Sequence, residues 1–162
     1  MFSLPHTGDH YIQRSMIKTP VTLRWTRAKK ILATNNLVAG EGEVLVPSST
    51  NGNYKVHVHF DAQGYLNGAQ CTCKDFYGNA AILKDAGAVE ARDINVPAWA
   101  QRRAREKYNV VTAVQNGEEH GIPLHYSGGH VTLVCKHILA AATVVTAKNM
   151  GWTVADLLAL GN

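Results

Sequence analysis

The sequence predicts an α+β fold in which an antiparallel β-meander packs on a C-terminal α-helix. Three observations support this prediction: strict apolar–polar alternation over 54–60, an apolar helix-forming stretch over 136–148, and a Cys-x-Cys motif far upstream of a Cys-x-His motif. With 162 residues, of which 46% are hydrophobic and 17% charged, the chain has the length and composition of one globular domain. We therefore expect a single core.

The N-terminal stretch 1–20 is interpreted as an irregular arm, because prolines and a glycine interrupt its mixed polar sequence. A single domain is expected over 21–162. Its first element is predicted to be a helix with Thr22 as cap and Asn35-Asn36 at its end, because apolar residues recur there with helical spacing.

Three strand candidates follow, over 43–47, 54–60 and 65–73, and turn-rich sequence separates them. In the second, four apolar or aromatic residues lie on one face and polar residues on the other, which is typical of a half-buried strand. The resulting antiparallel meander would deliver Cys71 and Cys73 at its end. Residues i and i+2 of an extended chain point to the same face, so both thiols could reach one ion.

The long segment 74–134 is interpreted as a partly helical insertion. Its first part, 75–93, shows no clean period, and a helix is predicted from Pro97 to Tyr108. A strand is expected over 110–114 and a turn over 126–130.

The most continuous helical stretch is 136–148, where alanine and leucine favour a helix and Gly151 ends it. A short last helix is expected after Thr153, which would cap it together with Asp156 in a capping-box arrangement.

Cysteine use points to a metal site. The chain has three cysteines, an odd number that argues against a disulfide framework. Three thiolates and one imidazole complete the tetrahedral shell of a structural zinc ion. We therefore expect one structural Zn²⁺ with these ligands: Cys71, Cys73, Cys135 and His137.

The two motifs together resemble the SWIM zinc finger, whose pattern is Cys-x-Cys, a spacer, then Cys-x-His followed by an apolar helix. The segment Cys-Lys-His-Ile-Leu-Ala over 135–140 is especially similar to that family, and the resemblance covers about 40–73 and 131–148. It implies a strand pair leading into a helix, clamped by zinc, and a role in binding DNA or other proteins. The chain departs from the family in its spacer, which is unusually long at 74–134.

Charge suggests an anionic partner, since the net charge is +4 and the isoelectric point is near 9.0. Two basic helices are expected to contact nucleic acid, DNA in preference to RNA, with Trp99 and Tyr108 stacking on bases or anchoring the helix. The alternative without a binding role is a solvated helix face with a core tryptophan. The candidate contact residues are Arg24, Arg27, Lys29, Lys30, Arg102, Arg103, Arg105 and Lys107.

The rival hypothesis is a protein-interaction or assembly subunit of a larger, oligomeric complex, with the zinc site stabilising the contact platform. Apolar residues such as Phe2, Ile12 and Met16 occupy an arm too small for its own core, as expected of a segment that docks on a neighbour. A homo-oligomer is one form of this alternative.

Five other histidines attract attention. His57 and His59 lie on the polar face of a strand, either as exposed side chains or as a second metal or phosphate site. His120, His125 and His130 are interpreted as surface residues, with His130 as a reserve ligand.

Catalysis is not expected. The sequence has no glycine-rich phosphate loop, and the metal site uses every cysteine, so we assign no catalytic residue. No apolar run approaches the roughly 20 residues that span a bilayer, and no secretory signal is visible at the N-terminus. The expected location is cytoplasmic, where thiols stay reduced.

Overall fold

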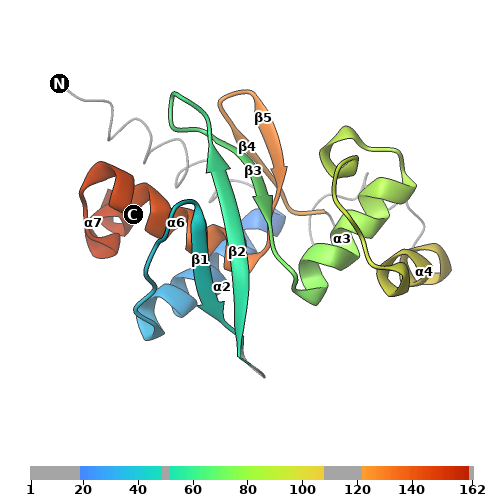
Figure 1. The fold of residues 1–162 in the computed structure, drawn as a ribbon, viewed down its shortest axis with the longest axis horizontal. Coiled ribbons are helices and arrows are strands. Elements are labelled where there is room, and N and C mark those ends of the chain that lie inside the picture. Colours follow the sequence, from blue (N-terminus) through green and yellow to red (C-terminus); the bar gives the residue numbers. More distant parts are fainter. Residues whose placement is uncertain (1–18, 49–51, 108–121, 161–162) are drawn as a thin grey trace.

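The computed structural model describes residues 19–48, 52–107 and 122–160, and Figure 1 shows their arrangement. The elements in chain order are α2 (Thr19–Thr34), β1 (Glu43–Pro47), β2 (Asn53–Phe60), β3 (Leu66–Gln70), α3 (Lys74–Asp85), the 3₁₀ turn η1 (Val89–Ala91), α4 (Ala98–Lys107), β4 (Leu124–Ser127), β5 (His130–Leu133), α6 (Lys136–Met150) and α7 (Val154–Leu160). The α+β class and the antiparallel meander predicted from the sequence are confirmed.

The three-stranded sheet has the order β1-β2-β3, and both strand pairs are antiparallel. The predicted alternation determines its faces. Val56 and Val58 of β2 are buried, as is Val44, which pairs with Val56, whereas His57 and His59 are exposed. The sheet therefore has one face on the core and one face toward solvent, as its period of two requires.

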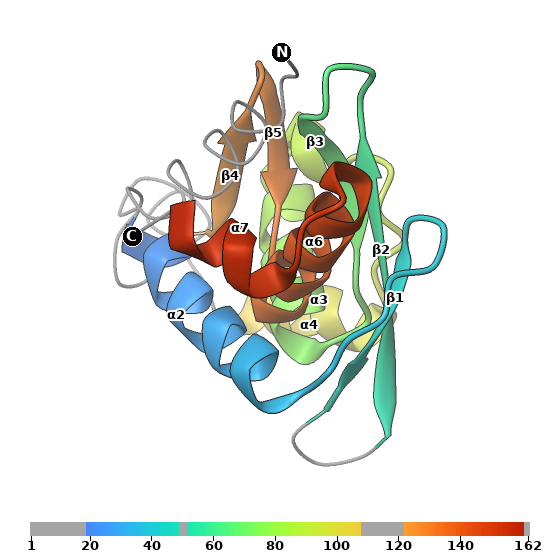
Figure 2. The ribbon, with the colours of Figure 1, turned by 90° about the vertical axis from the view of Figure 1, so that its left-hand side faces the viewer.

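Helix α6 lies at the centre of the core. Every residue from His137 to Ala147 is buried, so this helix has no polar face. Figure 2 shows α2 on one side of α6 and the sheet on another, and α6 contacts α2, β1, β2 and α7. Trp25 and Ala28 of α2 are almost fully buried in the same cluster. An all-round apolar helix of this kind is stable only when other elements cover every side.

The end of α6 and the start of α7 match the sequence-based expectation. Gly151 follows α6 with φ of 70°, a left-handed conformation that glycine adopts without steric cost. The backbone N–H of Asp156 donates to Thr153 Oγ1 at 3.1 Å, so Thr153 caps α7 as predicted. None of the helices in the described residues is long and apolar enough to cross a membrane.

Some boundaries differ from the prediction. Helix α2 already includes Thr19 and Pro20, so Thr22 lies inside the helix rather than capping it, and the expected arm is shortened. Proline is tolerated in the first turn, where its missing N–H has no helical partner. The third strand spans Leu66–Gln70 rather than 65–73. Residues 1–18, with the apolar arm, and the expected strand over 110–114 lie outside the described residues.

The insertion contains more regular structure than its composition indicated. Segment 75–93, which shows no clean period, contains α3 and η1, and α4 begins after Pro97 as predicted. A hairpin of β4 and β5 surrounds the expected turn over 126–130. Gly128 has φ of 53° there, and a Cβ atom would lie 2.2 Å from the Tyr65 ring, so this close approach requires glycine.

Candidate metal centre

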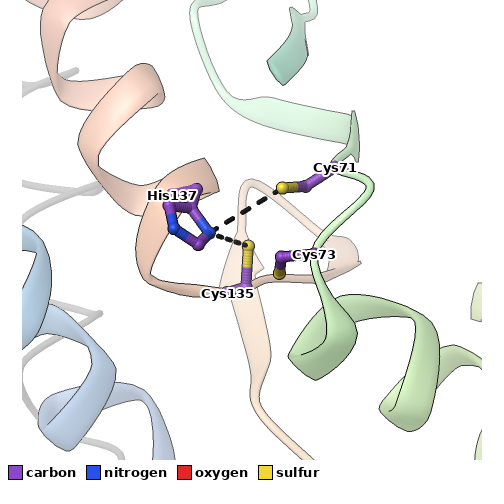
Figure 3. Close-up of side chains that lie close together, drawn as sticks. All are labelled: Cys71, Cys73, Cys135 and His137. Atoms are coloured by element: carbon purple, nitrogen blue, oxygen red, sulfur yellow. Dashed lines mark hydrogen bonds between the residues drawn. The ribbon is translucent and has the colours of Figure 1, made fainter. Parts of the chain in front are cut away.

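The four predicted ligands come together where two helices begin. Cys71 and Cys73 follow β3, and Cys73 is the N-cap residue of α3. Cys135 is the N-cap residue of α6, and His137 lies in the first turn of that helix. Figure 3 shows the four side chains pointing toward one another from the β3–α3 connection and from the start of α6. The fold thus joins motifs that are 61 residues apart in the sequence.

The geometry of the cluster fits a tetrahedral ion. Its four ligand atoms all lie within 4.8 Å of one another. His137 Nδ1 is 3.9 Å from Cys71 Sγ and 3.8 Å from Cys135 Sγ. Zinc bonds of about 2.3 Å to sulfur and about 2.0 Å to nitrogen place such atoms about 3.5 Å apart at a tetrahedral angle. The arrangement could therefore hold a metal ion with only small adjustments of side-chain torsions.

The cluster is buried, and its surroundings favour negative charge. The relative exposures of Cys71, Cys73, Cys135 and His137 are 2%, 4%, 0% and 5%. The backbone N–H of Phe76 donates to Cys73 Sγ at 3.3 Å, which caps α3 and also stabilises a thiolate. Because α3 and α6 both begin at the cluster, the positive ends of two helix dipoles point toward it.

The pKa values of the three thiols are shifted in opposite directions, because ionisation of one thiol disfavours ionisation of its neighbours. Hydrogen bonds with Cys135 and Cys71 hold the pKa of Cys73 far below its usual range. Burial and the neighbouring cysteines raise the pKa of Cys135. For Cys71, the hydrogen bond with Cys135 lowers the pKa, but the effect of Cys73 together with burial prevails and raises it to about 12. Three adjacent buried thiolates therefore need a cation to balance their charge.

The imidazole of His137 is held in place by Tyr54 of β2, whose ring centroid lies 4.7 Å away at an interplanar angle of 54°. Figure 3 shows the ring edge that carries Nδ1 turned toward the sulfur atoms of Cys71 and Cys135. Tyr54 and Phe76 are supporting residues that the sequence analysis did not assign. The position of Phe76, three residues after Cys73, is the signal that could have identified the capping bond.

The remaining histidines do not join the cluster. His130 Nε2 lies 2.9 Å from Asp61 Oδ2, so the proposed reserve ligand forms an ion pair instead. The pKa of Asp61 is lowered chiefly by the backbone N–H of Tyr65, with a further contribution from His130. His125 was expected at the surface, and this is wrong: its exposure is 1%, and burial lowers its pKa to about 4. His120 lies outside the described residues.

The candidate basic residues are separated by the fold. Helix α2 packs on α6, whereas α4 packs on α3, and Figure 1 shows α4 at the end of the molecule opposite α7. Arg24 is engaged in structure, since its Nε and Nη2 both donate to the Asp75 carboxylate at 2.9 Å. Lys29 Nζ lies 5.8 Å from the ring centroid of Trp25. Both side chains therefore support the fold.

The others differ in exposure. Arg105 Nε lies 3.6 Å from Asp85 Oδ1, and the side chain of Lys107 is not described. Trp99 is 42% exposed, with its ring edge-on to Tyr77 at 6.4 Å, so it is not a core tryptophan. The candidates whose side chains are exposed without a charged partner in the described residues are Arg27, Lys30, Arg102 and Arg103.

Comparison of the chain with protein-family models, curated proteins and solved structures gives no match in any of the three.

Proposed function

We propose that the protein is a non-enzymatic, SWIM-like zinc-binding module that contacts nucleic acid, DNA in preference to RNA, through helix α4. Cys71, Cys73, Cys135 and His137 would hold one Zn²⁺. The ion supplies positive charge to three buried sulfur atoms and cross-links the β3–α3 connection to α6, and four protein ligands leave no open position for catalysis. The donor set and the S–N separations near 3.8 Å support zinc.

One observation carries the nucleic-acid contact: Trp99, Arg102 and Arg103 share an exposed face of α4. Their spacing of i, i+3 and i+4 places them side by side on a helix. Ala100 and Ala104 on the opposite face are 1% and 2% exposed, so the helix is fixed with its basic aromatic face outward. Guanidinium groups bind phosphates, and an exposed indole offers a stacking surface to unpaired bases.

Helix α2 offers a smaller basic surface for nucleic-acid contact than the sequence predicted. Arg27 and Lys30, spaced i and i+3, form a second, smaller basic surface. Because α2 and α4 pack on different helices, a single short oligonucleotide would bind at α4 first, and α2 would matter only for longer strands.

The test is fluorescence anisotropy of labelled single-stranded and duplex DNA and RNA with the zinc-loaded protein over a salt series. Each phosphate contact contributes about −0.7 to the slope of log affinity against log salt for a single strand. Arg102→Ala with Arg103→Ala should therefore reduce the slope by roughly 1.4. Trp99→Ala should weaken single-strand binding more than duplex binding, because only unpaired bases stack on the indole.

The matched control is Lys55→Ala with Arg92→Ala, which removes the same charge from exposed side chains outside α4. It should leave the slope nearly unchanged. Absence of binding at low salt, or an equal loss in the control and the α4 variant, would show that α4 is not a nucleic-acid surface.

A second candidate is an assembly subunit, and exposed apolar side chains favour it. Val38 and Leu45, near the β1 edge of the sheet, are 76% and 53% exposed. Size-exclusion chromatography with light scattering separates the two functions. A stable oligomer that Leu45→Lys dissociates, together with no affinity for oligonucleotides, would favour assembly.

A further inference from the structure

The outer face of the three-stranded sheet carries a pocket of about 520 Å³. Residues of β2 and β3 line it from the sheet, which we call its floor, and residues of β5 and of 89–94, both in the insertion, also line it. Its volume lies in the range of roughly 300–1,000 Å³ that is typical of small-molecule sites. The insertion therefore supplies part of the lining.

The lining of this pocket is acidic in a chain of net charge +4. It includes the carboxylates of Glu41, Glu90 and Asp93, and no lysine or arginine is among the described residues that line it. These carboxylates come from two distant segments, and within the described part of the chain none of them forms an ion pair or a side-chain hydrogen bond. Their negative potential is therefore available to a ligand.

The polar floor adds hydrogen-bond acceptors. His59 and Asn67 both line the pocket, and His59 Nδ1 lies 2.5 Å from Asn67 Oδ1. Because the Asn67 side-chain oxygen accepts, Nδ1 donates this bond, and the side-chain oxygens of Asn67 and Gln70 provide acceptors on the floor. Gly68 lies beside His59 on the same face, and its missing side chain leaves space over the floor. The pocket thus offers negative charge, acceptors and room.

Apolar groups complete the walls. Val131 and Leu133 of β5 and Val89 and Ile94 of the insertion line the pocket between the polar groups. A ligand that satisfies all of these features has an alkyl stem and a positively charged, donor-rich head. We infer that the pocket binds a small organic cation, an alkylammonium or alkylguanidinium compound, whose head pairs with Glu90 and Asp93. This inference is independent of nucleic-acid binding at α4.

The test uses the zinc-loaded full chain and four probes of similar chain length. Putrescine and agmatine carry cationic heads, 1,4-butanediol is a neutral counterpart, and adipate is an anionic one. Isothermal titration and ¹H–¹⁵N NMR should give saturable binding for the two cations, with shifts centred on 89–94, and none for the other two. Saturable binding of adipate, or no binding of either cation at millimolar concentration, would overturn the inference.

Two kinds of variant locate the site. Glu90→Gln or Asp93→Asn should each weaken agmatine binding roughly tenfold or more, because each removes a charge-assisted hydrogen bond. Asp156→Asn, which removes an equal charge from exposed α7, should have little effect. An equal weakening by Asp156→Asn would indicate binding to general surface charge and would contradict the pocket.

Gly68→Val tests the space without altering the charge. A Cβ atom at this position meets only His59 Cβ, at 3.8 Å, and valine is favoured in strands, so the variant should fold. It should abolish agmatine binding while leaving the melting temperature and zinc content unchanged. Undiminished binding by folded Gly68→Val would place the ligand elsewhere.

Discussion

Helices α6 and α4 represent two regions that differ in how much of the helix surface is buried. Helix α6 buries every residue from His137 to Ala147 between the sheet and α2. Helix α4 contacts α3, and among its described side chains, 98–105, the fully buried ones are Ala100 and Ala104. The first region is held by apolar packing and begins at the cluster that could bind a metal ion. The second contributes little core and presents most of its surface.

The difference shows how the insertion obtains its position. Helix α3, against which α4 packs, begins at Cys73, a metal ligand that caps it through the N–H of Phe76. The cysteine–histidine cluster therefore lies at the start of a helix in each region, whereas the described part of α4 packs chiefly on α3 rather than on the sheet. Substitution of a cluster residue should therefore destabilise both regions, whereas substitution in α4 should destabilise α4 with little effect on α6.

The largest effect is expected from the ligands. Cys135→Ser removes a ligand at the start of α6, and structural zinc contributes about 10–16 kcal/mol in small zinc domains, against total stabilities of about 5–15 kcal/mol. We expect loss of bound metal and of the cooperative thermal transition, measured by elemental analysis and near-ultraviolet circular dichroism. A cooperative transition in metal-free Cys135→Ser would contradict this.

Cys73→Ser sharpens the comparison, because serine is a good N-cap residue. This variant should lose metal as Cys135→Ser does but keep helicity in α3. Hydrogen exchange of the α3 amides should therefore be similar in Cys73→Ser and in Cys135→Ser, which keeps the Cys73 cap, whereas α6 should lose protection in both variants. Full protection of α6 without metal would show that packing alone holds that region.

The next largest effects are expected from core substitutions, which should destabilise the protein more in α6 than in α4. Leu139 of α6 is 0% exposed, so Leu139→Ala should destabilise the protein by about 2–5 kcal/mol in urea unfolding. Ala104→Gly, at the buried face of α4, should cost about 1 kcal/mol, mainly through helix propensity. Equal effects of the two substitutions would mean that α4 is more deeply integrated than its packing indicates.

A pH effect of intermediate size is expected from His125 of β4. Burial lowers its folded pKa to about 4, below the ordinary value near 6.5, so the unfolded state binds the proton first. Stability should therefore fall as pH decreases from about 6.5 toward 4, by at most about 1.4 kcal/mol per pH unit. His125→Gln should show a shallower dependence between pH 7 and 5 in urea unfolding. Identical slopes in the two proteins would exclude this role.

The smallest effect is expected from the ion pair that joins α2 to α3. Arg24 and Asp75 form a bidentate contact, and their side chains are 17% and 43% exposed. A double-mutant cycle with alanine should give a coupling energy of up to about 1 kcal/mol. The more exposed pair Arg105–Asp85, with 3.6 Å between Nε and Oδ1, should give less. A larger coupling in the second pair would reverse the proposed hierarchy.

Much of the metal-clamped region was predictable from the sequence. Strict alternation identified β2, alanine and leucine content identified α6, and the odd cysteine count identified the ligand cluster. Helix α3 was missed although Phe76, Ala80 and Leu83 are spaced i, i+4 and i+7, because Gly78 and the many small residues between them obscured the period.

Other features depend on tertiary context. His125 and Ser127 are the inward residues of β4, so reading polar side chains as outward gave the wrong face. The pocket on the sheet could not be predicted, because its carboxylates lie about 50 residues apart in the sequence and meet only through the fold. The separation of α2 and α4 has the same origin, since their basic residues look alike in sequence but pack on different helices.

X-ray absorption at the zinc K-edge directly tests whether Cys71, Cys73, Cys135 and His137 bind zinc. The protein is purified without added metal, and its metal content is measured in parallel. We expect one zinc per chain with three sulfur ligands at about 2.3 Å and one nitrogen ligand at about 2.0 Å. A folded, metal-free protein, or zinc bound mainly through oxygen, would contradict it.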